Sequence, residues 1–332
     1  MLKIGLFGVG HLGKIHARLI KELSSHFEFV GFFDPNEDNA ITAVKEFKLQ
    51  QFHDIDGLLD CVDCIDIVTP TLSHFKIAQR AIEKGIHVFV EKPITHTVEE
   101  AKTLTNLVNS QNIIVQVGHV ERFNPAFSNA LPYFKEPRFI ETHRLAQYNP
   151  RGTDVPVVLD LMIHDIDIVL SVVKSKVKRV SASGVAVVSE TPDITNARLE
   201  FENGCVANLT ASRISMKNMR KSRFFQKDAY ISVDFLNKKT EIVKLTTLET
   251  EPDPFDIVLD LGTNKPKKKI EIFTPKFDEV NAIKLELETF AEAVVHKTSP
   301  IVSINDGYQA LKIAHQIMDD VNQNLSLIQE NN

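Results

Sequence analysis

The sequence predicts an α/β domain followed by an α+β domain, and three observations lead to this prediction. A glycine-rich turn lies between a short apolar run and a helical pattern at the N-terminus. Strand and helix patterns then alternate over roughly the first 120 residues, which indicates a parallel sheet with right-handed crossovers. After that, strand-like runs follow one another without helices, which indicates an antiparallel sheet. We expect domains at residues 1–120 and 121–332, with the C-terminal helices in the second.

The N-terminal stretch combines a strand, a tight turn and a helix. The apolar residues 4–7 precede Gly8-Val9-Gly10-His11-Leu12-Gly13, which has the spacing G-x-G-x-x-G. Gly8 permits the turn, Gly10 lets backbone N–H groups approach a pyrophosphate, and Gly13 lets the helix pack closely on the strand. The unpaired N–H groups of the helix N-terminus then favour the phosphates. This pattern predicts a Rossmann domain, with His11 and Leu12 beside the cofactor.

Asp34 closes the second apolar run, about 20 residues beyond the last glycine of the motif. A carboxylate at this position accepts hydrogen bonds from the hydroxyls of an adenosine ribose, and it repels a 2′-phosphate. We therefore expect NAD as the cofactor, with NADP less favoured.

The remaining elements of the first half place polar groups at strand ends. We expect helices at 37–47, 73–84 and 98–109, a weak strand near 51–52, and strands at 65–69, 86–90 and 113–117. Ligands bind outside the carboxyl ends of such strands. Besides the glycine loop and Asp34, these ends carry Thr69-Pro70, Glu91-Lys92-Pro93 and Gly118-His119. We predict that Thr69, Pro70, Glu91 and Lys92 contact the cofactor.

The second half predicts one long apolar helix and several strands. Helices are expected at 123–134, 157–172, 280–296 and 306–325, and strands at 138–147, 179–188, 197–201, 205–212 and 230–235. Glu202-Asn203-Gly204 between two of the strands is a hairpin signal.

Composition excludes several classes of protein. The chain has 332 residues, 43% of them hydrophobic and 25% charged, with a net charge of −6, which argues against a nucleic-acid surface. We interpret Lys265–Lys269 as a solvated turn and the basic run Arg213–Lys227 as a solvated sheet face. Cys61 and Cys64 form a C-x-x-C pair that we interpret as core residues, and we predict no metal site. No signal peptide or membrane span is expected, and the predicted location is the cytoplasm.

Lys92 is the first candidate for catalysis. Pro93 restricts Lys92 to extended conformations, which would hold its ammonium group near a nicotinamide bound across the strand ends. A lysine there can hydrogen-bond a substrate hydroxyl and stabilise negative charge as a proton leaves. The alternative is that Glu91 and Lys92 only flank a solvated turn.

The long apolar helix carries the second candidate. Asp160, His164 and Asp167 share one face of an α-helix, at i, i+4 and i+7. Asp160 can accept a hydrogen bond from His164 and raise the pKa of its ring, as in a general base. A structural core histidine is the alternative, and a metal ligand is less favoured because no further ligand pair has a convincing spacing.

Two polar residues follow the last strand of the first domain. Arg122 and Asn124 are predicted to lie where the two domains meet, and a guanidinium there suits a carboxylate or phosphate of the substrate. The alternative is a hinge in which Asn124-Pro125 only begins a helix.

The order of these motifs resembles the Gfo/Idh/MocA family, named for glucose–fructose oxidoreductase and inositol 2-dehydrogenase. The resemblance covers essentially the whole chain and rests on Gly8–Gly13, Thr69-Pro70 with His74, Glu91-Lys92-Pro93, Asp160 with His164, Glu288-Thr289-Phe290, Pro300 and Asp306-Gly307. It implies His74 as a further cofactor contact and a homodimer or homotetramer built through the open sheet face. It also implies oxidation of a sugar or cyclitol hydroxyl, or the reverse, in which Lys92 and His164 hold and deprotonate that hydroxyl.

Two stretches are similar to family members that act on UDP-N-acetylglucosamine, or its uronate, at C3. They are residues 118–125, and residues 151–155 leading into Asp160 and His164. Three other functions stay open: a glycosidase or epimerase that recycles its NAD, an inositol-type dehydrogenase, and a non-catalytic dinucleotide-binding sensor. The presence of both Lys92 and His164 argues against the sensor.

Overall fold

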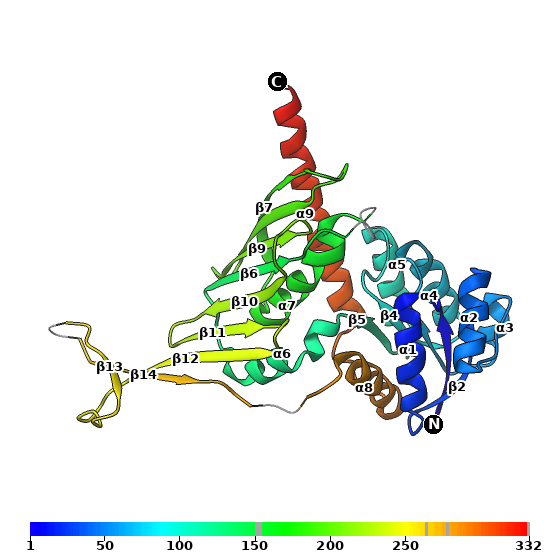
Figure 1. Ribbon diagram of the computed structural model, residues 1–332, viewed down its shortest axis with the longest axis horizontal. Coiled ribbons are helices and arrows are strands. Elements are labelled where there is room, and N and C mark those ends of the chain that lie inside the picture. The colour runs from blue at the N-terminus through cyan, green and yellow to red at the C-terminus, as the bar shows by residue number, and fades with distance from the viewer. Residues whose placement is uncertain (150–154, 263–264, 277–278, 331–332) are drawn as a thin grey trace. The chain divides into compact units, whose positions relative to one another are not determined.

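Contacts within the chain define two units in the computed structural model, which describes residues 1–149, 155–262, 265–276 and 279–330 (Figure 1). The first unit contains Met1–Phe123 and Val280–Ile313, and the second contains Asn124–Glu279 and Ala314–Asn332. The first unit is therefore discontinuous in sequence, because Val280–Ile313 returns to it. The sequence analysis placed one domain boundary between residues 120 and 121, with all C-terminal helices in the second domain. A functional division into domains 1–120 and 121–332 stays a prediction.

The first unit is built on a five-stranded parallel sheet in the order β2-β1-β3-β4-β5. Its strands are β1 (Leu2–Phe7), β2 (Phe27–Phe33), β3 (Cys64–Ile67), β4 (His87–Glu91) and β5 (Val115–Gly118). The order runs outward in both directions from the β1–β3 pair, so the glycine loop after β1 lies where the winding of the sheet reverses. This is the position where doubly wound sheets bind nucleotides.

Helices connect these strands, and their ends follow local signals. They are α1 (His11–Glu22), α2 (Glu37–Phe47), α3 (Ile55–Leu59), α4 (His74–Glu83) and α5 (Val98–Asn109), with 3-10 turns at Thr71–Ser73 and Val120–Phe123. Helix α5 begins with a capping box, in which the Thr97 hydroxyl accepts from the Glu100 N–H and the Glu100 carboxylate accepts from the Thr97 N–H. The predicted helices 37–47 and 98–109 are confirmed residue for residue.

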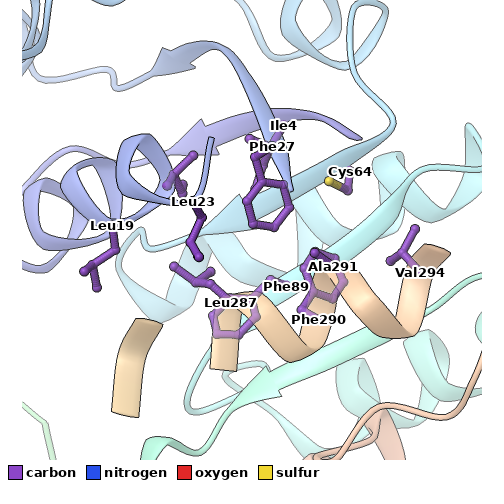
Figure 2. Packing of buried hydrophobic residues seen from close by; sticks show 11 residues of the cluster. Ile4, Leu19, Leu23, Phe27, Cys64, Phe89, Leu287, Phe290, Ala291 and Val294 are labelled. Atoms are coloured by element: carbon purple, nitrogen blue, oxygen red, sulfur yellow. The ribbon is translucent and has the colours of Figure 1, made fainter. Parts of the chain in front are cut away.

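Helix α8 (Ala282–His296) completes the core of the first unit. Figure 2 shows Leu287, Phe290, Ala291 and Val294 of α8 packed with apolar residues of the sheet and of α1. The rings of Phe290 and Phe89 meet edge to face, with centroids 5.9 Å apart. Full burial of a side chain as large as Phe290 contributes about 1.5–3 kcal/mol, so α8 is an integral part of this unit.

The second unit contains a nine-stranded sheet in the order β13-β14-β12-β11-β10-β6-β9-β8-β7. Its strands are β6 (Phe139–Leu145), β7 (Val177–Val185), β8 (Ile194–Phe201), β9 (Val206–Ser212), β10 (Met219–Phe225), β11 (Ala229–Asp234), β12 (Lys239–Thr247), β13 (Ile257–Leu259) and β14 (Lys268–Phe273). Every pair in it is antiparallel except β6 with β9. The predicted combination of a parallel and a mostly antiparallel sheet is confirmed.

Short helices accompany this sheet. They are α6 (Pro125–Ala130), a 3-10 turn at Leu131–Tyr133, a π-helical turn at Val158–Met162 and α7 (Ile163–Val173); the last helix, α9 (Ile304–Glu330), contributes residues to both units. Among the described residues, no helix combines the length and apolar character needed to cross a bilayer.

Several details differ from the sequence-based expectations: the predicted helix 123–134 is divided into α6 and flanking 3-10 turns, and strands β10, β12, β13 and β14 were not predicted. Lys268 and Lys269 begin β14, so 265–269 is not only a turn. Cys61 is exposed, because it lies in the loop after α3, and only Cys64, which starts β3, is a core residue. The predicted helix 157–172 begins with a π-helical turn, in which hydrogen bonds span five residues instead of four.

Candidate active site

The glycine loop after β1 has the geometry that close phosphate approach requires. Gly8 has φ +90°, and a Cβ on it would lie 2.8 Å from the Val68 carbonyl oxygen. A Cβ on Gly13 would lie 2.1 Å from the Gly8 carbonyl oxygen, so no larger residue fits there. Helix α1 begins at His11, and its N-cap, Gly10, offers no side-chain hydrogen bond. The first N–H groups of α1 are thus suited to an anion, and the exposed side chains of His11 and Leu12 begin the same turn.

Asp34 connects the glycine loop to the end of β2. Its Oδ2 accepts the Val9 N–H at 2.8 Å, and its Oδ1 accepts the Asn36 N–H at 2.8 Å. A carboxylate oxygen has a second lone pair, so the side chain keeps capacity for ribose hydroxyls. Asp34 also lines a cavity of about 350 Å³ whose other lining residues include Phe33, Ile41 and Phe52. The chemistry of this donor and acceptor set fits the adenosine half of a dinucleotide.

The turn after β4 holds Lys92. The Lys92 N–H donates to Glu91 Oε2 at 3.2 Å, and the Lys92–Pro93 peptide bond is cis. The buried ring of His74 faces two carbonyl oxygens, that of Pro93 at 2.9 Å from Nδ1 and that of Thr69 at 2.8 Å from Nε2. Burial lowers the pKa of His74. His74 therefore joins the ends of β3 and β4; direct contact of His74, Thr69, Pro70 or Glu91 with a cofactor stays a prediction.

A buried polar cluster lies beneath this turn, and the sequence analysis did not identify it. His16 of α1 contacts Asp66 of β3 (Nδ1 to Oδ2, 2.8 Å) and Glu91 (Nε2 to Oε1, 3.5 Å). Glu286 of α8 belongs to the same cluster, with its carboxylate near the imidazole of His16 and the carboxylate of Glu91. One signal was present in the sequence: Asp66 interrupts the apolar run 65–67, and a buried carboxylate requires a partner.

The candidate residues of the second unit lie at the start of the long apolar helix. Asp160 is in the π-helical turn and His164 is in the first turn of α7, and both are half-buried. The adjacent Asp165 is fixed by a buried bidentate ion pair with Arg144 of β6, at 2.9 Å (Nε to Oδ2) and 3.2 Å (Nη2 to Oδ1). The hydrogen bond from His164 to Asp160 stays a prediction, as does the pairing of His164 with Lys92 of the first unit.

Arg122 and Asn124 already have structural contacts. Arg122 Nη2 lies 3.6 Å from Asp306 Oδ1 at the start of α9. Asn124 caps α6 by accepting the Ala126 N–H at 3.1 Å, and its Nδ2 donates to the Phe235 carbonyl at 3.0 Å. These contacts give each residue a structural role within its own unit. Binding of the substrate by Arg122 or Asn124 stays a prediction. Residues 151–154 of the stretch 151–155 lie outside the described residues.

The fold and the glycine loop define a dinucleotide-binding protein of the Rossmann class. Residues 2–119 match the family described as "Oxidoreductase family, NAD-binding Rossmann fold", and residues 118–228 match the "GFO/IDH/MocA C-terminal domain". The chain belongs to the Gfo/Idh/MocA family of oxidoreductases, as its motifs predicted.

Similar proteins within the family act on different substrates. UDP-N-acetylglucosamine 3-dehydrogenase of Acidithiobacillus ferrooxidans is 36% identical over 296 residues, which is 88% of this chain and 92% of that protein. A solved structure of that enzyme has a TM-score of 0.86 at 32% identity, covering 96% of this chain and 97% of the other. The scyllo-inositol 2-dehydrogenase (NAD⁺) of Bacillus subtilis is 26% identical over 94% of this chain and 92% of its own length.

Proposed function

We propose that this protein is an NAD-dependent dehydrogenase that oxidises C3 of UDP-N-acetylglucosamine, or of the corresponding uronate, or catalyses the reverse reduction. The observation that carries this proposal is the likeness to UDP-N-acetylglucosamine 3-dehydrogenase, 36% identical over 88% of this chain. The glycine loop, Asp34 and the turn that holds Lys92 fit such a reaction. The protein would act in the cytoplasm.

The proposed roles follow from the chemistry of alcohol oxidation. NAD, when bound, supplies the hydride acceptor. His164, oriented by Asp160, takes the hydroxyl proton, because a neutral imidazole is a good base near neutral pH. Lys92 stabilises the oxygen as negative charge develops on it. Arg122 and Asn124 would contact the polar part of the substrate.

The test is NAD reduction measured against a panel of UDP-sugars, free sugars, sugar phosphates and inositols. Saturable NADH formation with UDP-N-acetylglucosamine or its uronate, and a 3-keto product identified by mass spectrometry and NMR, is the expected result. Activity confined to inositols would instead support the second candidate, an inositol-type dehydrogenase, which the 26% identity to scyllo-inositol 2-dehydrogenase favours.

Two other functions give different outcomes in the same assay. A glycosidase or epimerase that recycles its cofactor would purify with bound NAD and convert substrate without net NADH release. A non-catalytic sensor would bind dinucleotide and give no turnover with any substrate of the panel.

Asp34→Ala should weaken NAD binding by about tenfold and reduce the preference for NAD over NADP. The variant removes an acceptor for the ribose hydroxyls and also the negative charge that repels a 2′-phosphate. The measurement is the Kd of both cofactors by calorimetry or fluorescence. The Val9 N–H also loses its acceptor in this variant. If the only effect were a general loosening of the loop, the affinities for NAD and NADP would fall by the same factor. An unchanged NAD/NADP ratio would contradict the assigned role.

We also propose that the open face of the large sheet joins subunits into a homodimer or homotetramer. The rings of Phe139, Phe225 and Tyr230 contact one another across β6, β10 and β11, with centroids 5.7 and 5.0 Å apart. Phe139 is 36% exposed and Phe225 is 38% exposed. Light scattering after size-exclusion chromatography tests this, and a monomer at micromolar concentration would refute it.

A further inference from the structure

The buried cluster under the Lys92 turn brings together ionisable groups from four elements of the first unit. They are His16 on α1, Asp66 on β3, Glu91 at the end of β4 and Glu286 on α8. Asp66, His16 and Glu286 have no exposed surface. One ligand atom each from His16, Glu91 and Glu286 lies within 4.8 Å of the other two. Gly118 of β5 packs closely against the cluster. A Cβ at this position would lie only 2.9 Å from Glu91 Oε1.

The hydrogen bonding of the cluster is incomplete. His16 is held by Asp66 through Nδ1, and Glu91 holds the Lys92 N–H. Both carboxylate oxygens of Glu286 lack a hydrogen-bond partner among the described residues, and so does Gln116 Oε1 beside it. Gln116 uses its amide group to donate to the Glu286 carbonyl at 2.7 Å. A buried oxygen without a partner is costly, so Glu286 requires a proton, a water or a cation that would satisfy it.

We propose that Glu286 is a neutral carboxylic acid that completes a proton-sharing cluster with Glu91, His16 and Asp66, and that this cluster positions Lys92. With every group ionised, three carboxylates would face one imidazolium in a site with almost no exposure to bulk solvent. A proton on Glu286 removes one negative charge and supplies a donor for the acceptors around it, directly or through one trapped water. His16 and Glu286 are thus positioning residues, and Glu91 transmits their effect to the Lys92 backbone.

The environments of Glu286, His16 and Glu91 agree with this distribution of protons. Burial also raises the pKa of Asp66, and the neighbouring ring of His16 opposes that effect. Burial and the neighbouring Glu91 raise the pKa of Glu286 well above its ordinary value. Burial favours the neutral ring of His16, but Asp66 and Glu91 outweigh it and raise the pKa of His16 well above its ordinary value. Burial also opposes ionisation of Glu91, yet His16 and Lys92 lower its pKa. Glu91, which contacts the Lys92 turn, is therefore an ionised member of the cluster.

A cation is the alternative way to satisfy these atoms. His16, Glu91 and Glu286 are metal-ligating residue types, and a histidine oriented by a carboxylate is common beside metals. A metal ion, however, must shed its hydration shell and needs a path of entry, and the side chains of His16 and Glu91 are only 0% and 12% exposed. A proton bound to Glu286 needs neither a set of ligands nor an opening wide enough for an ion. The geometry therefore favours protonation.

The direct test is infrared difference spectroscopy of the whole protein at about pH 8, where a solvated glutamate would be ionised. Glu286→Gln should remove a carboxylic-acid C=O band. Glu288→Gln, on the same helix with 37% of its side chain exposed, is the matched control and should remove none. Absence of such a band in the unmodified protein overturns the proposal. So does a stoichiometric metal, measured by mass spectrometry, that is lost in Glu286→Gln.

Stability supplies a second readout that is independent of activity. A glutamate whose pKa is raised on folding binds a proton in the folded state and loses it on unfolding. The free energy of unfolding therefore falls as the pH rises above the ordinary glutamate pKa of about 4.5. Glu286→Gln removes this dependence. The ratio of unfolding constants, unmodified protein over variant, should rise by up to about tenfold per pH unit between about pH 5 and the pKa in the folded state. A ratio independent of pH overturns the proposal.

The link to Lys92 rests on the proposed function. Glu91→Gln, which weakens the contact between the cluster and the Lys92 backbone, should lower kcat at least about tenfold at saturating NAD. An unaffected kcat in Glu91→Gln would refute positioning of Lys92 by the cluster. Lack of turnover in the unmodified protein would refute the function, while the infrared and stability results would still decide whether Glu286 is protonated.

Discussion

Lys92→Met should lower kcat by about 10²–10⁴-fold, the range for losing a group that acts on the reacting proton or its charge. The affinity for NAD should change little, because the phosphate loop and Asp34 lie on other strands of the sheet. Methionine has a similar length and no charge, and the backbone hydrogen bond from residue 92 to Glu91 Oε2 is retained. The measurement is steady-state turnover with the substrate that the panel identifies, together with the Kd for NAD.

The control for this variant is Lys76→Met, which removes an exposed lysine from α4. It should leave both kcat and the Kd unchanged. If Lys92→Met turns over normally, Lys92 has no catalytic role, and the alternative interpretation, in which Glu91 and Lys92 only flank a turn, is correct. If turnover and NAD binding are lost together, Lys92 is needed for the cofactor site rather than for the chemical step.

Asp165→Leu should destabilise the second unit by about 3–5 kcal/mol, because it removes the bidentate counter-charge of a guanidinium inside the protein. The Arg144 and Asp165 side chains are only 4% and 2% exposed. Since Asp165 adjoins His164 at the start of α7, this pair also fixes the helix that carries the proposed base. The measurement is unfolding in urea followed by circular dichroism, with hydrogen exchange to locate the loosened segments.

The matched comparison is the double variant Arg144→Met with Asp165→Leu. Replacing both partners removes the uncompensated charge, and much of the lost stability should return. Exchange should increase first in β6 and α7 in the single variant. A double variant that is no more stable than Asp165→Leu would show that the ion pair is not the reason for the loss.

Local signals explain where the predictions from sequence succeeded. The ends of α5 are fixed by Thr97 and Glu100, which are three residues apart. The glycine loop is recognisable because the positive φ of Gly8 and the close approach of Gly13 to the Gly8 carbonyl are both set within the loop itself. The nine-stranded sheet was harder to predict. Strands β10, β12 and β14 each carry several charged residues, β13 has only three residues, and β10 pairs with β6, which is distant in sequence.

The sequence by itself determined the class of this protein: a parallel sheet with a glycine loop after the first strand, a carboxylate at the end of the second and a lysine at a further strand end. Each of these features can be predicted from residues close together in the sequence, because local backbone geometry requires particular residue types at particular spacings. Only the tertiary structure decided that α8 packs in the first unit and that Glu286 joins His16, Asp66 and Glu91. These residues come from distant parts of the chain, and burial next to one another shifts their pKa values. Their spacing along the sequence does not reveal that they are buried together.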